Sequence, residues 1–163
     1  LEAFNVDIAK EYKKPAAERQ LPVFVAEIDG AKKYILPMYG AGLWGAIWGY
    51  IALNDDKNTV YGVFFNHAGE TPGLGANITT DAFCSQFEGK HIMQNGEFAS
   101  IAVMKVGQKA ESQDQVDAIS GGTITSKGVE LMLQTSVEKY TQFLKAIDCK
   151  KETTPEETNV EEE

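Results

Sequence analysis

The segment 126–147 constrains the fold more than any other part of this chain. Its apolar residues recur at intervals of three and four, the spacing that places side chains on one face of an α-helix. They are Val129, Met132, Leu133, Val137, Tyr140, Leu144 and Ile147. At the usual rise per residue, such a helix would be roughly 33 Å long. An apolar face of that length needs a partner surface, and earlier parts of the chain must supply it.

The first half of the chain has the pattern of antiparallel strands. Alternating apolar residues flank Asp29-Gly30 within residues 21–38, and this combination predicts a β-hairpin. Further strands are expected at residues 46–53, 59–65 and 100–106. Thr79 or Thr80 could cap a short helix that runs to Phe87. The whole pattern predicts an α+β fold, in which an antiparallel sheet packs against helices on one side.

The remaining segments suggest one domain with two extensions. Residues 1–20 carry a few apolar residues at helical spacing and are expected to form a short N-terminal helix or a linker. Residues 21–149 are expected to form the domain. Residues 107–122 are expected to be a long polar loop within it. Residues 150–163 are rich in Glu and Thr and are expected to form an acidic disordered tail.

Composition limits the classes of partner. The chain has 24 acidic and 15 basic residues and a net charge of −9, which argues against nucleic acid or an anionic membrane surface as a partner. Cys84 and Cys149 have no metal-type or redox spacing, so free thiols are favoured, although a disulfide stays open. His67 and His91 have no acidic or cysteine partners nearby in sequence, so no metal site is expected.

The long helix is preceded by small and hydroxyl-bearing residues, D-A-I-S-G-G-T-I-T-S from Asp117 to Ser126. Backbone N–H groups at a helix N-terminus lack partners within the helix, and the helix dipole is positive there. A phosphate is well accommodated at such a point, and glycines let a ligand approach the backbone closely. On these physical grounds alone, Thr123 is more simply interpreted as a residue that caps a backbone N–H group.

The string from Asp117 to Thr123 resembles the motif D-x-x-[S/T]-G-A-T of domains that bind FMN covalently. In that family a phosphoester joins the ribityl phosphate to the last threonine, which implies Thr123 as the acceptor. Thr125 is the nearest competing acceptor, and Gly122 stands where the family usually has Ala. Asp117 is expected to organise the loop by accepting hydrogen bonds from N–H groups near Ile119 and Ser120.

Two other stretches resemble the same family. Residues 70–75 read E-T-P-G-L-G, a signature of these domains, and residues 39–50 read Y-G-A-G-L-W-G-A-I-W-G-Y. The second stretch is similar to a segment typical of C subunits of sodium-translocating NADH:quinone oxidoreductases. The resemblance implies a flavin site, with Lys105 as a candidate countercharge. Its other expected members are Trp44, Glu70, Thr71, Gly73, Leu74, Gly75, Ser120, Gly121, Gly122, Thr123, Thr125 and Ser126.

Some of these residues have an alternative structural interpretation. Leu74, among glycines, is expected to offer an apolar face to the flavin ring, whereas Glu70 could equally be an exposed side chain. Trp44 and Trp48 are more readily interpreted as core residues, because aromatic side chains carry much of the buried area of a core. Of the two, Trp44 is the better candidate for contact with the ring.

The resemblance implies an electron carrier with no catalytic residue of its own. Its FMN would serve a membrane complex that oxidises NADH, reduces ubiquinone and exports sodium ions. The implied partners are the other subunits of that complex and a flavin transferase. The domain would lie on the extracytoplasmic side of the inner membrane, anchored in the full-length form by an N-terminal membrane helix.

Two alternatives stay open. One is the corresponding subunit of the Rnf ferredoxin:NAD oxidoreductase complex, which usually lacks the Gly-Leu-Trp-Gly sequence found at residues 42–45. The other is a non-redox binding module of the cell envelope. That module would remain colourless after coexpression with a flavin transferase.

Overall fold

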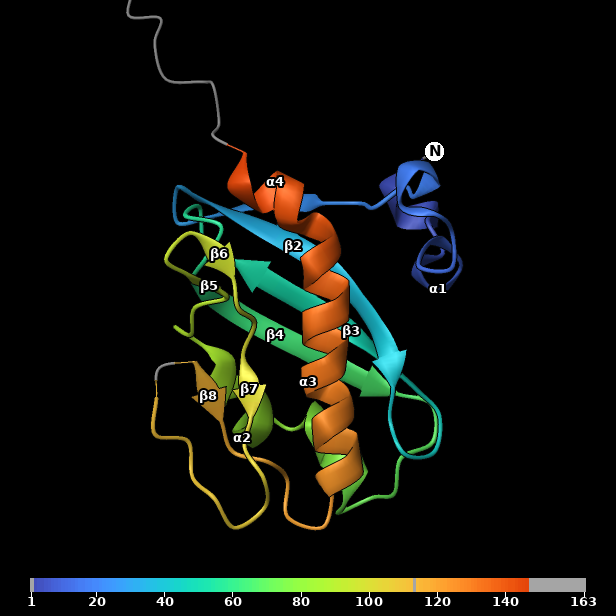
Figure 1. The fold of residues 1–163 in the computed structure, drawn as a ribbon, viewed down its shortest axis with the longest axis vertical. Helices are drawn as coiled ribbons and strands as arrows, with labels where there is room; N and C mark the ends of the chain where they lie inside the picture. Colours follow the sequence, from blue (N-terminus) through green and yellow to red (C-terminus); the bar gives the residue numbers. More distant parts are fainter. Residues whose placement is uncertain (1, 113, 147–163) are drawn as a thin grey trace, which may run out of the picture.

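A four-stranded antiparallel sheet lies against one long helix in the computed structural model, which describes residues 2–112 and 114–146 (Figure 1). The strands are β1 (Phe24–Ile28), β2 (Ala31–Ala41), β3 (Ala46–Leu53) and β4 (Val60–His67), and they are neighbours in that order. The long helix α3 spans Thr123–Val137 and crosses one face of the sheet. The predicted α+β fold, an antiparallel sheet packed against helices, is therefore confirmed.

Short elements complete the described chain. The helices are α1 (Ile8–Glu11), α2 (Asp81–Cys84) and α4 (Thr141–Lys145). Single 3₁₀ turns occupy Ala3–Asn5, Ala16–Glu18, Gly75–Thr79, Ser85–Phe87 and Glu138–Tyr140. Strands β5 (Met93–Gln94) and β6 (Glu97–Phe98) form a small hairpin, and β7 (Ala102–Val103) pairs in parallel with β8 (Gln115–Val116).

Local sequence signals predict the sheet well. Asp29 and Gly30 have φ angles of 53° and 75°, the left-handed conformation that a two-residue hairpin turn of type I′ requires. Ile28 pairs with Ala31 across this turn, and the predicted hairpin is confirmed. Strand β3 has the predicted bounds. Strand β4 was predicted at residues 59–65, and it begins one residue later and ends two residues later.

The predicted strand at residues 100–106 is wrong except for the two residues of β7. Ser100 has a φ angle of 64°, which breaks an extended chain. The N–H group of Val103 donates to the Glu130 carboxylate at 3.0 Å and so is withdrawn from any strand ladder. The pairing partner of β7 is β8, within the segment predicted to be a loop.

The long helix is shorter than predicted and begins earlier. Helix α3 starts at Thr123 rather than Ser126 and ends at Val137, where a 3₁₀ turn leads into α4. The buried Tyr140 sits at this change of direction, and its hydroxyl donates to the carbonyl of Pro22 at 3.1 Å. The predicted apolar face is nevertheless the one that is buried. Ile147, Cys149 and the predicted tail lie outside the described residues.

Tyr12 and Phe4 connect the N-terminal residues to the domain, Phe4 through its ring against that of Phe24 in β1. The predicted helix of residues 1–20 is limited to α1 and two 3₁₀ turns. The hydroxyl of Tyr12 donates to the carbonyl of Pro37 at 3.0 Å, and the ammonium of Lys139 lies 4.5 Å from the ring centroid. Burial raises the pKa of Tyr12 to about 12, as expected for a phenol withdrawn from water.

Helix α3 lies close to the end of β2, because glycines on both elements leave room at the crossing. A Cβ atom at Gly128 would overlap the carbonyl oxygen of Ala41, and one at Gly40 would lie 2.8 Å from the Cβ of Met132. The core between helix and sheet includes Leu36, Met38, Ile47, Ile51, Phe65, Val129, Met132 and Leu133. This close approach brings the N-terminal turn of α3 to the loops that follow β2 and β4.

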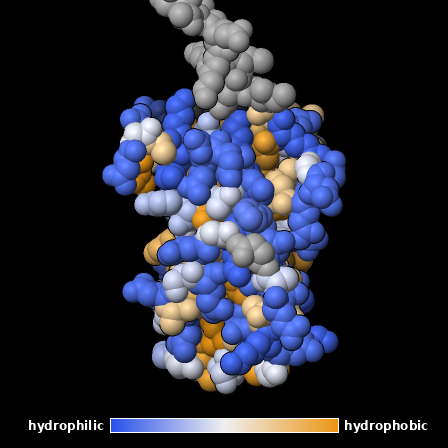
Figure 2. Space-filling model, turned by 90° about the vertical axis from the view of Figure 1, so that its left-hand side faces the viewer, coloured by the Kyte–Doolittle hydropathy of each residue, from blue (hydrophilic) through white to orange (hydrophobic). Residues whose placement is uncertain are grey.

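The side shown in Figure 2, which carries β5, β6 and β8, is largely hydrophilic, with apolar residues in small separate patches. None of the helices within the described residues combines the length and the apolar character that crossing a bilayer requires.

We expect Gly128→Ala to lower the free energy of unfolding by about 1–3 kcal/mol, because the new methyl group must push α3 away from β2. The opposite sign would hold at an open helix position, where Ala stabilises relative to Gly. Urea denaturation measures the effect. Gly62→Ala is the control, since a Cβ atom there meets nothing within 4 Å. Equal stability of Gly128→Ala and wild type would contradict the close packing of α3.

Candidate functional site

The three segments singled out in the sequence meet at the N-terminal end of α3. They line a pocket of about 370 Å³, which we call the three-loop pocket. Its described lining residues are Leu43, Trp44, Glu70, Thr71, Leu74, Gly75, Gly121, Gly122, Thr123, Ile124 and Thr125. Its volume lies within the range of small-molecule and cofactor sites.

Glu70 connects all three segments. Its side chain is only 4% exposed, so the alternative of a surface glutamate is wrong. One carboxylate oxygen accepts the backbone N–H of Trp44 at 2.9 Å, and the other accepts the hydroxyl of Thr125 at 2.5 Å. The N–H of Glu70 donates to Nδ1 of His67 at 3.1 Å. One buried carboxylate therefore fixes the loop after β2, the loop after β4 and the first turn of α3.

Glycines make room for this arrangement. A Cβ atom at Gly42 or Gly75 would overlap an oxygen of the Glu70 carboxylate, and the one at Gly75 would also lie 2.5 Å from the Thr125 hydroxyl. Gly121 has a φ angle of 72°, and a Cβ atom there would lie 2.5 Å from the Leu74 side chain. The glycines are thus required by packing within the site.

The hydroxyl groups at the start of α3 have different roles. Thr123 is the first residue of the helix and is exposed, whereas Thr125 is 1% exposed and its hydroxyl is held by Glu70. Ser126 is also 1% exposed, and its hydroxyl accepts the N–H of Ile119 at 3.0 Å. The residue at the N-cap position is Gly122, so the interpretation of Thr123 as the cap is wrong.

Large apolar side chains stand exposed around the pocket. Trp44 is 67% exposed and Ile124 58% exposed, and Leu43 and Leu74 are 46% and 44% exposed. A core position for Trp44 is therefore wrong, while Trp48 is partly buried. Exposed apolar groups gathered around a cavity indicate a ligand or a partner. The sequence analysis did not include Ile124 in the site. Ile124 is an apolar residue that does not fall on the predicted buried face of the helix, and this could have indicated contact with a ligand.

Four of the expected site residues do not line the pocket. Gly73 forms a turn with a φ angle of 75°, and Ser120 is an exposed residue before the pocket. Ser126 supports the loop from inside through Ile119. Lys105 is exposed in the loop that follows β7, away from the described lining of the pocket.

Asp117 organises its loop through a different partner from the one expected. Its carboxylate accepts the N–H of Ala110 at 2.6 Å, and its own N–H donates to the side chain of Gln86 at 2.8 Å. The N–H of Ile119, an expected partner, donates instead to Ser126. Asp117 thus connects the start of the long loop to the segment that leads into Thr123.

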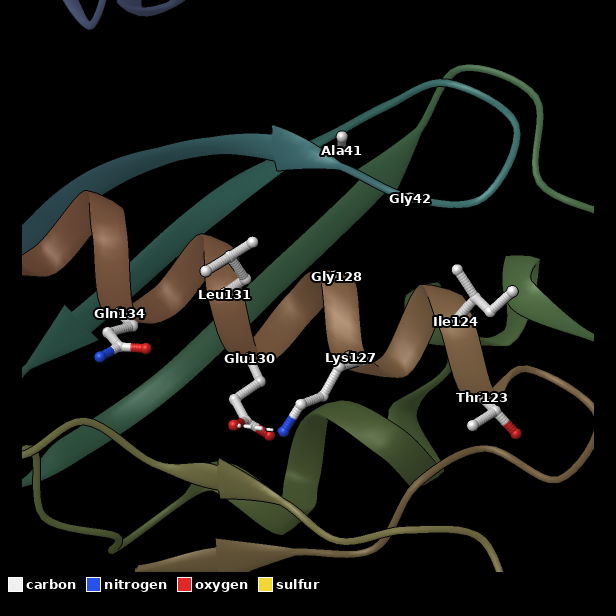
Figure 3. Close-up of a pocket in the computed structure, with 9 residues that line it drawn as sticks. All are labelled: Ala41, Gly42, Thr123, Ile124, Lys127, Gly128, Glu130, Leu131 and Gln134. Atoms are coloured by element: carbon white, nitrogen blue, oxygen red, sulfur yellow. Dashed lines mark hydrogen bonds and ion pairs between the residues drawn. The ribbon is translucent and has the colours of Figure 1, made fainter.

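A second cavity of about 540 Å³ is lined by residues of α3 and by the end of β2 (Figure 3). We call it the α3 groove. Its described lining residues are Ala41, Gly42, Thr123, Ile124, Lys127, Gly128, Glu130, Leu131 and Gln134. Lys127 and Glu130 form an ion pair of 2.7 Å at its edge. Thr123 and Ile124 line both cavities.

The cysteine and metal predictions are tested only in part. Cys84 is a free thiol that donates to the carbonyl of Ile78 at 3.4 Å, and burial raises its pKa, which lowers its reactivity. Its candidate disulfide partner, Cys149, lies outside the described residues. Among residues 2–112 and 114–146, no three His, Cys, Asp or Glu side chains are grouped as metal ligands.

Known proteins resemble this chain in sequence and in fold. The sequence profile of the FMN-binding domain family matches residues 42–138, more than half of the chain. A crystal structure of the C subunit of Na⁺-translocating NADH-quinone reductase from Parabacteroides distasonis is 53% identical, with a TM-score of 0.83. That match covers 91% of this chain and 72% of the other. The structure of Shewanella oneidensis NqrC is 32% identical, with a TM-score of 0.65 over 82% of this chain and 67% of the other.

A curated relative is longer than this chain. The C subunit of Na⁺-translocating NADH-quinone reductase from Vibrio anguillarum is 39% identical over 102 residues, or 63% of this chain and 40% of the relative. The chain therefore matches less than half of that protein's length.

We expect Glu70→Ala to lower the free energy of unfolding by about 1–3 kcal/mol, because the substitution leaves the N–H of Trp44 and the hydroxyl of Thr125 without their acceptor. Chemical denaturation of the flavin-free protein measures this effect. Glu88→Ala, at an exposed glutamate, is the matched control and should change stability by no more than about 0.5 kcal/mol. If both variants lose the same amount, Glu70 does not hold the site together.

Proposed function

Because the chain belongs to the FMN-binding domain family and to the family of C subunits of Na⁺-translocating NADH-quinone reductases, we propose that it carries FMN covalently on Thr123 as an electron-transfer protein. The observation that supports Thr123 is the contrast between two threonines in one helical turn. Thr123 is an exposed residue, whereas Thr125 is buried and its hydroxyl donates to Glu70.

The three-loop pocket suits the chemistry of FMN. The first N–H groups of α3 have no partners within the helix and can solvate a phosphodiester. Leu43, Trp44, Leu74 and Ile124 offer exposed apolar surface for a flat ring. Thr71 and the backbone of the 70–75 loop provide polar groups at the same pocket. When bound, flavin supplies one- and two-electron transfer, which the side chains around the pocket do not provide.

The residues around Thr123 favour attachment by an enzyme. Glu70 and the glycines fix the loops, so the exposed residue Thr123 stands on a preformed turn. A flavin transferase can reach its hydroxyl without opening the core. Covalent attachment would keep the cofactor on a protein that faces an aqueous compartment.

The relatives suggest in which complex this chain transfers electrons. We propose that the chain serves a membrane complex that oxidises NADH, reduces quinone and exports sodium ions. The other subunits of that complex would be its partners, and the domain would lie on the extracytoplasmic side of the inner membrane. The matches to C subunits favour this assignment over the Rnf alternative.

Thr123→Ala should abolish the FMN adduct in protein that is coexpressed with a flavin transferase and exported. Thr125→Val should retain the adduct, because its hydroxyl is already committed to Glu70. Intact-mass measurement, followed by mapping of the modified peptide, checks both variants. An adduct on Thr125 in Thr123→Ala would contradict the assignment. A colourless, unmodified wild-type protein would favour the binding-module alternative.

Asp117→Ala should slow flavin attachment several-fold while the domain remains folded. The substitution removes the acceptor for the N–H of Ala110 and loosens the loop that leads to Thr123. Adduct mass is followed against time for this variant and for Glu111→Ala, an exposed acid in the same loop. Equal rates for both variants and wild type would show that Asp117 has no part in presenting the acceptor.

A further inference from the structure

The α3 groove is apolar and open to solvent. Ile124 and Leu131 are seven residues apart on one face of α3, and they are 58% and 57% exposed. Figure 3 shows both side chains on the side of the helix that faces Ala41 and Gly42 at the end of β2. Exposed helix positions usually carry polar side chains, so this apolar pair indicates a surface that is covered in use.

We propose that the α3 groove is a second docking position for the isoalloxazine ring of the FMN attached to Thr123. This inference rests on the proposed attachment. Its basis is that Thr123 and Ile124 line both the three-loop pocket and the α3 groove. A ring tethered to Thr123 stands between two cavities and can lie in either one.

Size and reach are compatible with this assignment. The cavity volumes of about 370 and 540 Å³ both lie in the range of cofactor sites. Leu131 is eight residues from Thr123, roughly 12 Å along the helix. A ribityl chain followed by three fused rings covers such a span. Lys127, which is paired with Glu130, and the exposed Gln134 also line the groove, and in Figure 3 their side chains point away from Ile124 and Leu131.

The two positions differ in one property that can be measured. The exposed indole of Trp44 lines the three-loop pocket, whereas none of the described residues that line the α3 groove is aromatic. An indole in contact with oxidised flavin quenches its fluorescence by donating an electron to the excited ring. A ring in the three-loop pocket therefore has a short fluorescence lifetime, and a ring in the α3 groove has a long one.

Time-resolved fluorescence of the oxidised protein, flavinylated by coexpression with the transferase, tests the proposal. Wild type should show two decay components. Trp44→Leu should lengthen the short component. Leu131→Asp should reduce the amplitude of the long component, because a carboxylate in the groove disfavours an apolar ring. Val106→Asp is the matched control, since Val106 is 45% exposed and lines neither cavity, and it should leave the decay unchanged.

Several results would overturn the proposal. A single decay component in wild-type protein whose mass shows the adduct would exclude a second position and leave the attachment intact. A missing adduct in wild type would contradict the attachment and the second position together. A long component insensitive to Leu131→Asp would exclude the groove as its source. If Leu131→Asp impaired electron transfer in the assembled complex without changing the decay, the groove would be a surface for another protein of the complex.

Discussion

The hydrogen bonds of the Glu70 carboxylate hold the candidate site together. A buried carboxylate without partners would cost several kcal/mol, so its two acceptor oxygens must be satisfied by the protein. The donors come from the loop after β2 and from α3, while Glu70 itself belongs to the loop after β4. Because the three segments share one buried carboxyl group, none can move without breaking a hydrogen bond to it. Gly42 and Gly75 have no side chain for the same reason, since any Cβ atom would occupy the space of the carboxylate.

The position of α3 depends on a second constraint, the contact between glycines and backbone at its crossing with β2. Gly128 lets the helix lie against the carbonyl of Ala41, and Gly40 makes room for Met132. Without this approach, the hydroxyl of Thr125 would not reach the Glu70 carboxylate. The core between α3 and the sheet, which includes Leu36 and Leu133, therefore supports the site indirectly, because it fixes the distance between the helix and the sheet.

Features set by near neighbours in the sequence could be predicted, and features set by distant partners could not. The Asp29-Gly30 turn and the strands around it follow from local patterns, as does the buried face of α3. The burial of Glu70 could not be inferred, because its donors lie 26 and 55 residues away. The prediction of a strand at residues 100–106 was wrong for a similar reason, because the N–H of Val103 donates to the distant Glu130. The motifs identified the loops of the site and implied Thr123 as the acceptor, but not that the competing hydroxyl of Thr125 is buried and bonded to Glu70.

The residue at the N-cap of α3 would give the proposed covalent cofactor a role in the stability of the fold. Gly122 has no side chain that could accept the first N–H groups of the helix, although Ser, Thr, Asp or Asn usually does so. In the proposed flavinylated protein, the phosphodiester on Thr123 adds a permanent negative charge at this positive end of the helix. Such a charge contributes about 0.3–1 kcal/mol at an exposed helix end. Flavinylation would thus complete the capping of α3, so that maturation of the protein and stabilisation of its main helix become one chemical event.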